Sequence, residues 1–164
     1  MTTQVSEDFR SEYPFLDFGV WRVFGVIRGE PSEENYGWGD RERPVYAAVP
    51  GPAETMTTGN WKGFVERWLL SEAGRLILVG FEYDDFERED RIRDVHETLE
   101  GDFYLVLKSE FEGPRLYIPF RDGVLVTDRA RWKHEDYVGP SPIAAELRAG
   151  PHPQFPRPAR LWYE

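Results

Sequence analysis

Short apolar stretches separated by polar turns divide the chain, and several of them favour β-strands. Residues 19–28 and 75–81 are rich in β-branched and aromatic side chains, which is typical of strands. Residues 45–49 lie between Pro44 and Pro50, and because proline is tolerated at sheet edges we expect a short edge strand there. The continuous apolar run within 75–81 predicts a central strand that is buried on both faces.

Three further strand patterns follow one another in the second half of the chain. Residues 102–108 and 115–120 combine aromatic and β-branched side chains, and residues 124–127 are rich in β-branched ones, as strands are. The dipeptide Asp122-Gly123 lies between the last two, and Asp-Gly is a strong signal for a two-residue hairpin turn. The three segments therefore predict an antiparallel meander.

Two longer segments and one short segment carry the spacing of amphipathic helices. The first is residues 60–73, whose apolar side chains recur at i, i+3, i+4, i+7 and i+8. These side chains are Trp61, Phe64, Val65, Trp68 and Leu69. The second is residues 86–100, in which Ile92, Val95 and Leu99 share a helical face. Residues 142–149 predict a short third helix, with proline at its first position and glycine just past its end.

The order of these elements predicts an α+β fold. We expect a single domain over residues 1–150, in which a mostly antiparallel sheet of about five or six strands is packed by the two main helices. The short helix comes at the end of this domain. Residues 151–164 are rich in proline and predict a tail that packs on the domain or extends from it.

The composition fits this picture and removes several kinds of chemistry. The chain has 164 residues, 40% of them hydrophobic and 15% aromatic, which is enough to build a buried core. It contains no cysteine, so disulfides, thiolate nucleophiles and zinc–thiolate sites are excluded. Residues 1–8 lack the features of a secretory signal and no apolar run is long enough to span a membrane, so we expect a cytoplasmic protein.

The charge is unevenly distributed. Acidic residues outnumber basic ones by 30 to 20, which gives a net charge of −10. Residues 74–113 hold 12 acids and 5 bases, whereas residues 114–164 hold 6 acids and 8 bases. Such a surface repels nucleic acids and anionic membranes and attracts basic proteins. We therefore expect a basic protein partner and neither nucleic acid nor membrane binding.

The most acidic stretch, residues 82–90, is the first candidate site. Its candidate partner-binding residues are Glu82, Asp84, Asp85, Glu87 and Asp90. These carboxylates can dock a basic partner, or they can cap the predicted second helix and complement its dipole. A third interpretation is a metal site formed by Glu82, Asp84, Asp85 and His96, because hard cations bind carboxylate oxygens. The spacing does not match a calcium-binding EF-hand loop.

The second candidate site is the long polar loop over residues 30–43. It contains Tyr36, Trp38 and Asp40 among glycines and other acids. Exposed aromatic residues flanked by polar ones are typical of binding hot spots, so Tyr36 and Trp38 are candidate anchors for a partner. The alternative is that the two rings fold back on the core as a lid.

Neither the hydroxyl-bearing nor the basic residues form a recognisable motif. The chain has no Gly-x-Ser-x-Gly or Ser-x-x-Lys pattern. Five basic residues gather around the predicted hairpins and can bind an anion, but neighbouring acids dilute them, which favours pairing with the acidic middle of the chain. They are Arg115, Arg121, Arg129, Arg131 and Lys133.

Together these features predict a non-catalytic acidic protein, such as an inhibitor, an antitoxin-like protein or an adaptor, that docks a basic protein partner. No cofactor is expected. Two alternatives from other classes stay open. One is a metal-dependent hydrolase that uses the acidic cluster at 82–90, and the other is a small-molecule binder gated by loop 30–43.

Overall fold

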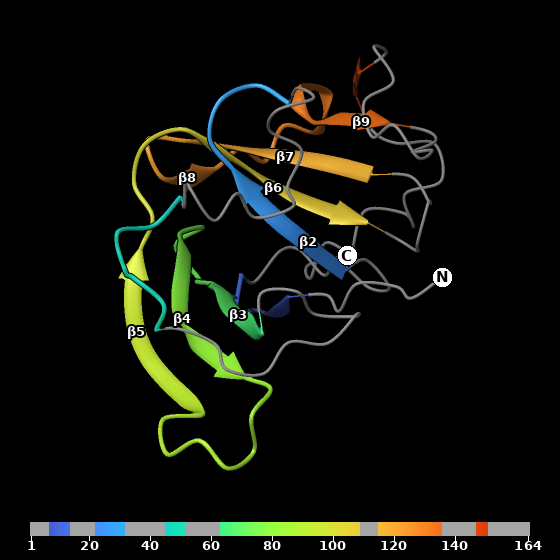
Figure 1. Cartoon of the computed structure of the whole chain (residues 1–164). Helices are drawn as coiled ribbons and strands as arrows, with labels where there is room; N and C mark the ends of the chain where they lie inside the picture. The colour runs from blue at the N-terminus through green and yellow to red at the C-terminus, as the bar shows by residue number, and fades with distance from the viewer. Residues whose placement is uncertain are drawn as a thin grey trace.

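Two β-sheets pack against each other in the computed structural model of the chain (Figure 1). The structure describes residues 7–13, 22–31, 45–51, 63–108, 115–135 and 147–150. The four-stranded sheet has the order β1-β3-β4-β5, and the larger sheet has the order β10-β9-β7-β6-β2, with β8 paired to β7. Figure 1 shows β3, β4 and β5 in the lower half of the view and β2, β6 and β7 in the upper half.

The strands of the smaller sheet are β1 (Asp8–Ser11), β3 (Phe64–Leu70), β4 (Leu76–Tyr83) and β5 (Ile92–Thr98). Those of the larger sheet are β2 (Arg22–Ile27), β6 (Phe103–Lys108), β7 (Arg115–Arg121), β8 (Val124–Leu125), β9 (Lys133–Glu135) and β10 (Arg148–Ala149). One 3-10 turn, η1 (Arg129–Arg131), precedes β9. All strand pairs are antiparallel except β1 with β3, which run parallel.

The main core fills the space between the two sheets. Both inner faces contribute large side chains that are almost completely buried, among them Trp68, Phe81, Phe103, Phe120 and Trp132. The rings of Phe103 and Phe120 stack with centroids 4.6 Å apart. Tyr46, which lies outside the sheets, packs its ring 6.0 Å from that of Trp68 and 5.6 Å from that of Phe81. Burial of these aromatic surfaces is the main force that holds the sheets together.

The predicted α+β class is wrong, because the described residues contain no α-helix and form two sheets rather than one. Most of the strand predictions are confirmed: β2, β4, β6, β7 and β8 lie in the segments expected to form strands. The hairpin at Asp122-Gly123 is also confirmed, since it joins Arg121 to Val124 with φ values of 51° and 77°, as a type I′ turn requires. However, β4 is not buried on both faces, because its side chains alternate between buried and half-buried.

The predicted helix over 60–73 is wrong, since its described part forms β3. The inward side chains of β3 are Phe64, Glu66, Trp68 and Leu70, and the outward ones are Val65, Arg67 and Leu69. The buried carboxylate of Glu66 interrupts the apolar alternation, and the remaining hydrophobic residues then match a helical spacing as well as a strand. Inside the core, the carboxylate of Glu66 is hydrogen-bonded to the Tyr46 hydroxyl.

The other two helix predictions fail in the same way. Within the segment 86–100, Ile92–Thr98 form β5, the last strand of the smaller sheet. Its alternate side chains are exposed and half-buried, so charged residues occupy both of its faces, as is common on edge strands. At the end of the segment 142–149, Arg148–Ala149 form β10, and residues 142–146 lie outside the described residues. The tail over 151–164 also lies outside them.

The predicted edge strand over 45–49 is wrong, because side chains rather than a backbone ladder hold residues 45–51. The carboxylate of Glu97 on β5 accepts hydrogen bonds from the amides of Ala47 and Ala48 at 2.7 and 2.8 Å. Three other side chains donate to carbonyl oxygens of this segment: Arg28 to Val45, Arg93 to Val49 and Tyr83 to Gly51. The segment therefore lies against β5 and brings Tyr46 into the core.

A pair of β-bulges bends the smaller sheet at the middle of β4. The register with β3 shifts after Arg67, and the register with β5 shifts between Leu78 and Gly80. Bulges bend a strand and increase its twist. The carbonyl oxygen of Arg93 approaches the backbone here so closely that a Cβ atom on Gly80 would lie 2.0 Å from it. In the bulged stretch of β5, His96 has a φ of 57°, which non-glycine residues rarely adopt.

We predict that Gly80→Ala lowers the free energy of unfolding by at least about 2 kcal/mol, because backbone rather than a flexible side chain must move to admit the methyl group. Gly51→Ala is the matched control. A Cβ there meets the tips of two side chains, Arg88 at 2.9 Å and Tyr83 at 3.4 Å, and we expect a loss below about 1 kcal/mol. Urea unfolding measures both. Equal losses would show that the bulges do not require glycine.

Candidate functional site

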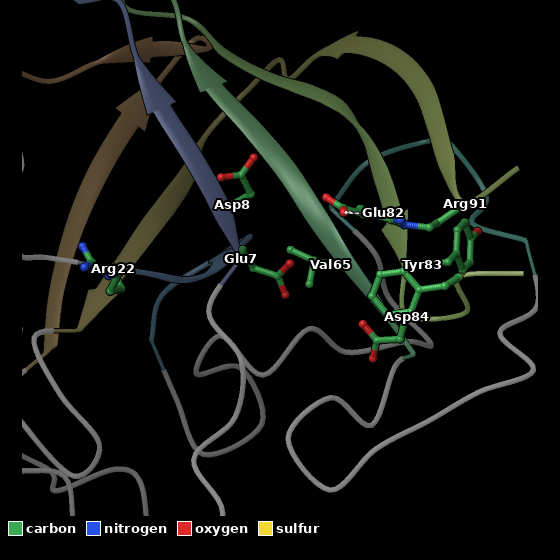
Figure 2. Close-up of a pocket in the computed structure, with 9 residues that line it drawn as sticks. Glu7, Asp8, Arg22, Val65, Glu82, Tyr83, Asp84 and Arg91 are labelled. Atoms are coloured by element: carbon green, nitrogen blue, oxygen red, sulfur yellow. Dashed lines mark hydrogen bonds and ion pairs between the residues drawn. The ribbon is translucent and has the colours of Figure 1, made fainter. Parts of the chain in front are cut away.

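An open hollow lies near the start of β1, the start of β3 and the end of β4 (Figure 2). Its volume is about 460 Å³. It is lined by four acidic residues, two arginines and three other residues: Glu7, Asp8, Glu82, Asp84, Arg22, Arg91, Val65, Tyr83 and Phe86. Carboxylates thus outnumber cationic side chains by two to one in its wall.

The sheet topology brings the acids of the hollow together from distant parts of the sequence. Because β1 runs parallel to β3 and β4 runs antiparallel to it, the start of β1 and the end of β4 point to the same end of the sheet, with β3 between them. Asp8 pairs in register with Arg67 of β3, and Glu82 pairs with Val65 two positions earlier on β3. Figure 2 shows Glu7 and Asp84 on either side of the gap below Val65, with Asp8 and Glu82 above it.

Glu7 forms the inner wall of the hollow. Its Oε2 accepts a hydrogen bond from the amide of Glu66, and its own amide donates to the carbonyl of Val23 at 3.2 Å. Tyr46 lies near both carboxylates, and burial, together with the charges of Glu66 and Glu7, raises the pKa of its hydroxyl far above the usual range. Tyr46 therefore stays protonated and serves as a hydrogen-bond donor inside this acidic corner.

One acid of the hollow is neutralised by an arginine. Glu82 forms an ion pair with Arg91, with 2.9 Å between Oε1 and Nη2, and both side chains are a third or more exposed. The same guanidinium lies 4.5 Å from the centre of the Phe86 ring. The ring of Phe86 is nevertheless 81% exposed, so the edge of the hollow presents an apolar surface next to its charges.

The connection between β4 and β5 is held by short-range contacts and projects at the bottom of the view in Figure 1. Asp85 accepts a hydrogen bond from the amide of Glu87 at 3.0 Å. Arg88 lies 3.7 Å from the centre of the Tyr83 ring and pairs with Asp90. The hydrogen bond from Arg88 lowers the pKa of Asp90. The arginines of this connection therefore satisfy some of the acids around them.

The structure separates the predicted acidic residues into two groups. Glu82 and Asp84 line the hollow, whereas Asp85, Glu87 and Asp90 lie in the connection beside it. Residues 82–91 contain six acids and two arginines, so this region stays net negative despite its ion pairs. The predicted helix-capping role of these acids is excluded, because β5 takes the place of the helix.

The sequence analysis missed Glu7, Asp8 and Phe86. The first two lie about 75 residues from Glu82, and only the parallel pairing of β1 with β3 brings them close. Phe86 could have been predicted from the sequence, because it is an aromatic residue between acids in the stretch 84–87. The other predicted partner-binding residues, Tyr36, Trp38 and Asp40, lie outside the described residues, as does most of loop 30–43.

Across the residues that the structure describes, no group of three or more His, Asp or Glu side chains is placed to hold a metal ion. Glu82, Asp84, Asp85 and His96 therefore do not form such a group. His96 is exposed in the bulged part of β5.

Two of the basic residues singled out in the sequence lie on the larger sheet and make polar contacts there. Arg121 donates a hydrogen bond to the Tyr104 hydroxyl at 3.2 Å, and Lys133 pairs with Glu30. Glu30 is not part of the acidic middle of the chain that was expected to pair with these bases. This pair lowers the pKa of Glu30.

Comparisons with protein-family models, with curated proteins and with solved structures gave no match. In the described parts of the chain, no helix has the length and apolar character needed to cross a membrane.

The two arginines of the β4–β5 connection should differ in their effect on stability. Arg88 is mostly buried, with 15% of its side chain exposed, and lies flat against Tyr83. We expect Arg88→Gln to lower the free energy of unfolding by about 1–2 kcal/mol through loss of this ring contact and of buried apolar surface. Arg91→Gln, at a more exposed pair, should cost less than about 1 kcal/mol. Urea unfolding tests this order, and a larger loss for Arg91→Gln would contradict the assignment.

Proposed function

We propose that this protein binds a basic protein partner by accepting a lysine or arginine side chain of the partner in the acidic hollow. An inhibitor, an antitoxin-like protein or an adaptor would work in this way. We also propose that the interaction takes place in the cytoplasm, as expected from the sequence. The proposal rests above all on two carboxylates that line the hollow, those of Asp8 and Asp84, which have no hydrogen bond or ion pair within the described part of the chain.

Asp8 and Asp84 differ from the other two acids that line the hollow. Among the described residues, neither carboxylate makes a hydrogen bond or an ion pair, whereas Glu82 and Glu7 are engaged with other groups of the chain. An incoming cationic side chain would gain charge-assisted hydrogen bonds from a free carboxylate of the hollow. It would not first have to break an internal ion pair.

The exposed ring of Phe86 supports a protein partner rather than a free ion. A ring that is 81% exposed at the edge of a charged hollow offers apolar contact area beside a point of electrostatic attraction. Protein interfaces commonly combine an aromatic contact with charged groups in this way. The net negative charge of the connection would also steer a basic partner toward the hollow and speed association.

The test begins with a peptide screen and then measures rates. A random-peptide library is selected on the full chain, and association of the best peptide is measured by surface plasmon resonance at low salt. We expect the selected peptides to carry lysine or arginine next to an apolar residue. For the double variant Asp8→Asn/Asp84→Asn, we expect association to slow by about tenfold.

The matched control is Glu72→Gln/Glu100→Gln, which makes the same change in net charge. Glu72 lies in the turn between β3 and β4, and Glu100 follows β5; both lie away from the hollow. We expect this control to slow association by less than about twofold. If both double variants slow association equally, the overall charge and not the hollow attracts the partner, and the proposal is wrong.

A variant of opposite sign gives a second, independent test. Arg91→Gln removes the arginine that pairs with Glu82 and so adds a free carboxylate to the hollow. We expect the selected peptide to associate about two- to fivefold faster with this variant at low salt, and the gain to shrink as salt rises. A slower association would mean that Arg91 itself contacts the partner.

A further inference from the structure

The larger sheet carries a second group of buried side chains on the face that points away from the main core. Alternation along β6 and β7 places Tyr104, Val106 and Tyr117 on this face, where they pack with Ile27 and Phe24 of β2. Two cationic side chains extend the same face toward the end of the sheet. They are Lys108, the last residue of β6, and Arg115, the first residue of β7.

Lys108 and Arg115 are directly opposite each other across the β6–β7 pair. Both are strongly buried, with 6% and 7% of their surfaces exposed. Like charges at directly opposed positions of a sheet repel each other, and burial strengthens that repulsion because less water screens it. Consistent with this, burial and the charge of Arg115 lower the pKa of Lys108.

The same aromatic ring contacts both cations. The Nζ of Lys108 lies 4.8 Å from the centre of the Phe24 ring, and the Cζ of Arg115 lies 4.2 Å from it. The face of an aromatic ring attracts cations, so Phe24 explains how the two groups are held in place. A ring carries no net charge and does not neutralise Lys108.

Among the described residues, Glu135 carries a carboxylate on this face, but it is on the wrong side of Arg115 to neutralise Lys108. Glu135 of β9 is opposite Arg115, so Arg115 separates it from Lys108. Its Oε1 accepts a hydrogen bond from the Tyr117 hydroxyl at 2.5 Å, and its buried Oε2 has no hydrogen-bond partner. In the described part of the chain, the ammonium of Lys108 has neither a hydrogen bond nor an ion pair.

We propose that Lys108 and Arg115 form a binding site for the oxyanion group of a small molecule, a carboxylate or a phosphate. An ammonium and a guanidinium on neighbouring strands can each bind an oxygen of such a group, although Arg115 also hydrogen-bonds the Tyr117 side chain. The bound anion would remove the repulsion between the two cations, and the Phe24 ring would contact the rest of the ligand. This site is separate from the acidic hollow and does not depend on the proposed function.

Thermal unfolding of the full chain tests the proposal, with sodium phosphate, sodium acetate or sodium chloride added at matched ionic strength. We expect phosphate or acetate to raise the Tm in a saturable way relative to chloride, because a ligand that binds only the folded state stabilises it. The larger response identifies the ligand group as a phosphate or a carboxylate. No saturable rise with either anion would overturn the proposal.

Two substitutions locate the effect. Lys108→Met removes one of the two opposed charges, so its Tm in chloride should equal or exceed that of the wild type, and it should no longer respond to the anion. Lys133→Met is the matched control on the same sheet face. Because Lys133 pairs with Glu30, this variant should have a lower Tm but keep the response. A full anion response in Lys108→Met would overturn the proposal.

Nuclear magnetic resonance gives a readout that does not depend on the variants folding. Titration of the wild-type chain with the more effective anion should shift the backbone amide signals of Lys108, Arg115 and Phe24 along one saturable curve. Shifts spread over unrelated exposed lysines and arginines would indicate an adventitious ion only and would contradict the site.

Discussion

The parallel pairing of β1 with β3 is the constraint on which the acidic hollow depends. Antiparallel pairing would place the start of β1 at the opposite end of the sheet, beside the β3–β4 turn, and Asp8 would lie far from Asp84. The observed pairing instead directs the start of β1, with Glu7 and Asp8, toward the same end of the sheet as the end of β4, with β3 between them. The amide of Glu66, which donates to Glu7, and the bridge from Glu7 to Val23 fix this arrangement on both sides.

Each sheet carries unbalanced charge, which is negative on the smaller sheet and positive on the larger one. The hollow on the smaller sheet holds more carboxylates than arginines, and two of these carboxylates are free within the described residues. The larger sheet buries two adjacent cations, and one of them lacks a counter-ion in the same part of the chain. Other acids and bases of the described residues pair, among them Glu30 with Lys133 and Asp94 with Arg67. The hollow and the opposed cations Lys108 and Arg115 are therefore places where an external charge of the right sign would be stabilising.

The sequence predicted strands well where apolar residues run together and failed where a charge faces the core. β4, β6 and β7 carry continuous apolar runs, and these segments were correctly expected to be strands. In β3, buried Glu66 disrupts the alternation, and in β5 charged residues occupy both faces, so both segments matched a helix. The acids at 82–84 were visible in the sequence. The sequence did not show that Glu7 and Asp8 line the same hollow, because strand pairing over long sequence distances leaves no local signal.

A double-mutant cycle between the hollow and its ligand tests the central claim most directly. Asp84→Asn is combined with replacement of the lysine or arginine of the bound partner or selected peptide by methionine, and the four affinities give the coupling energy between the two side chains. If the cationic side chain enters the hollow, the coupling should be about 1.5 kcal/mol or more, as for close charge pairs at interfaces. A coupling near zero for every cationic residue of the ligand would contradict the account.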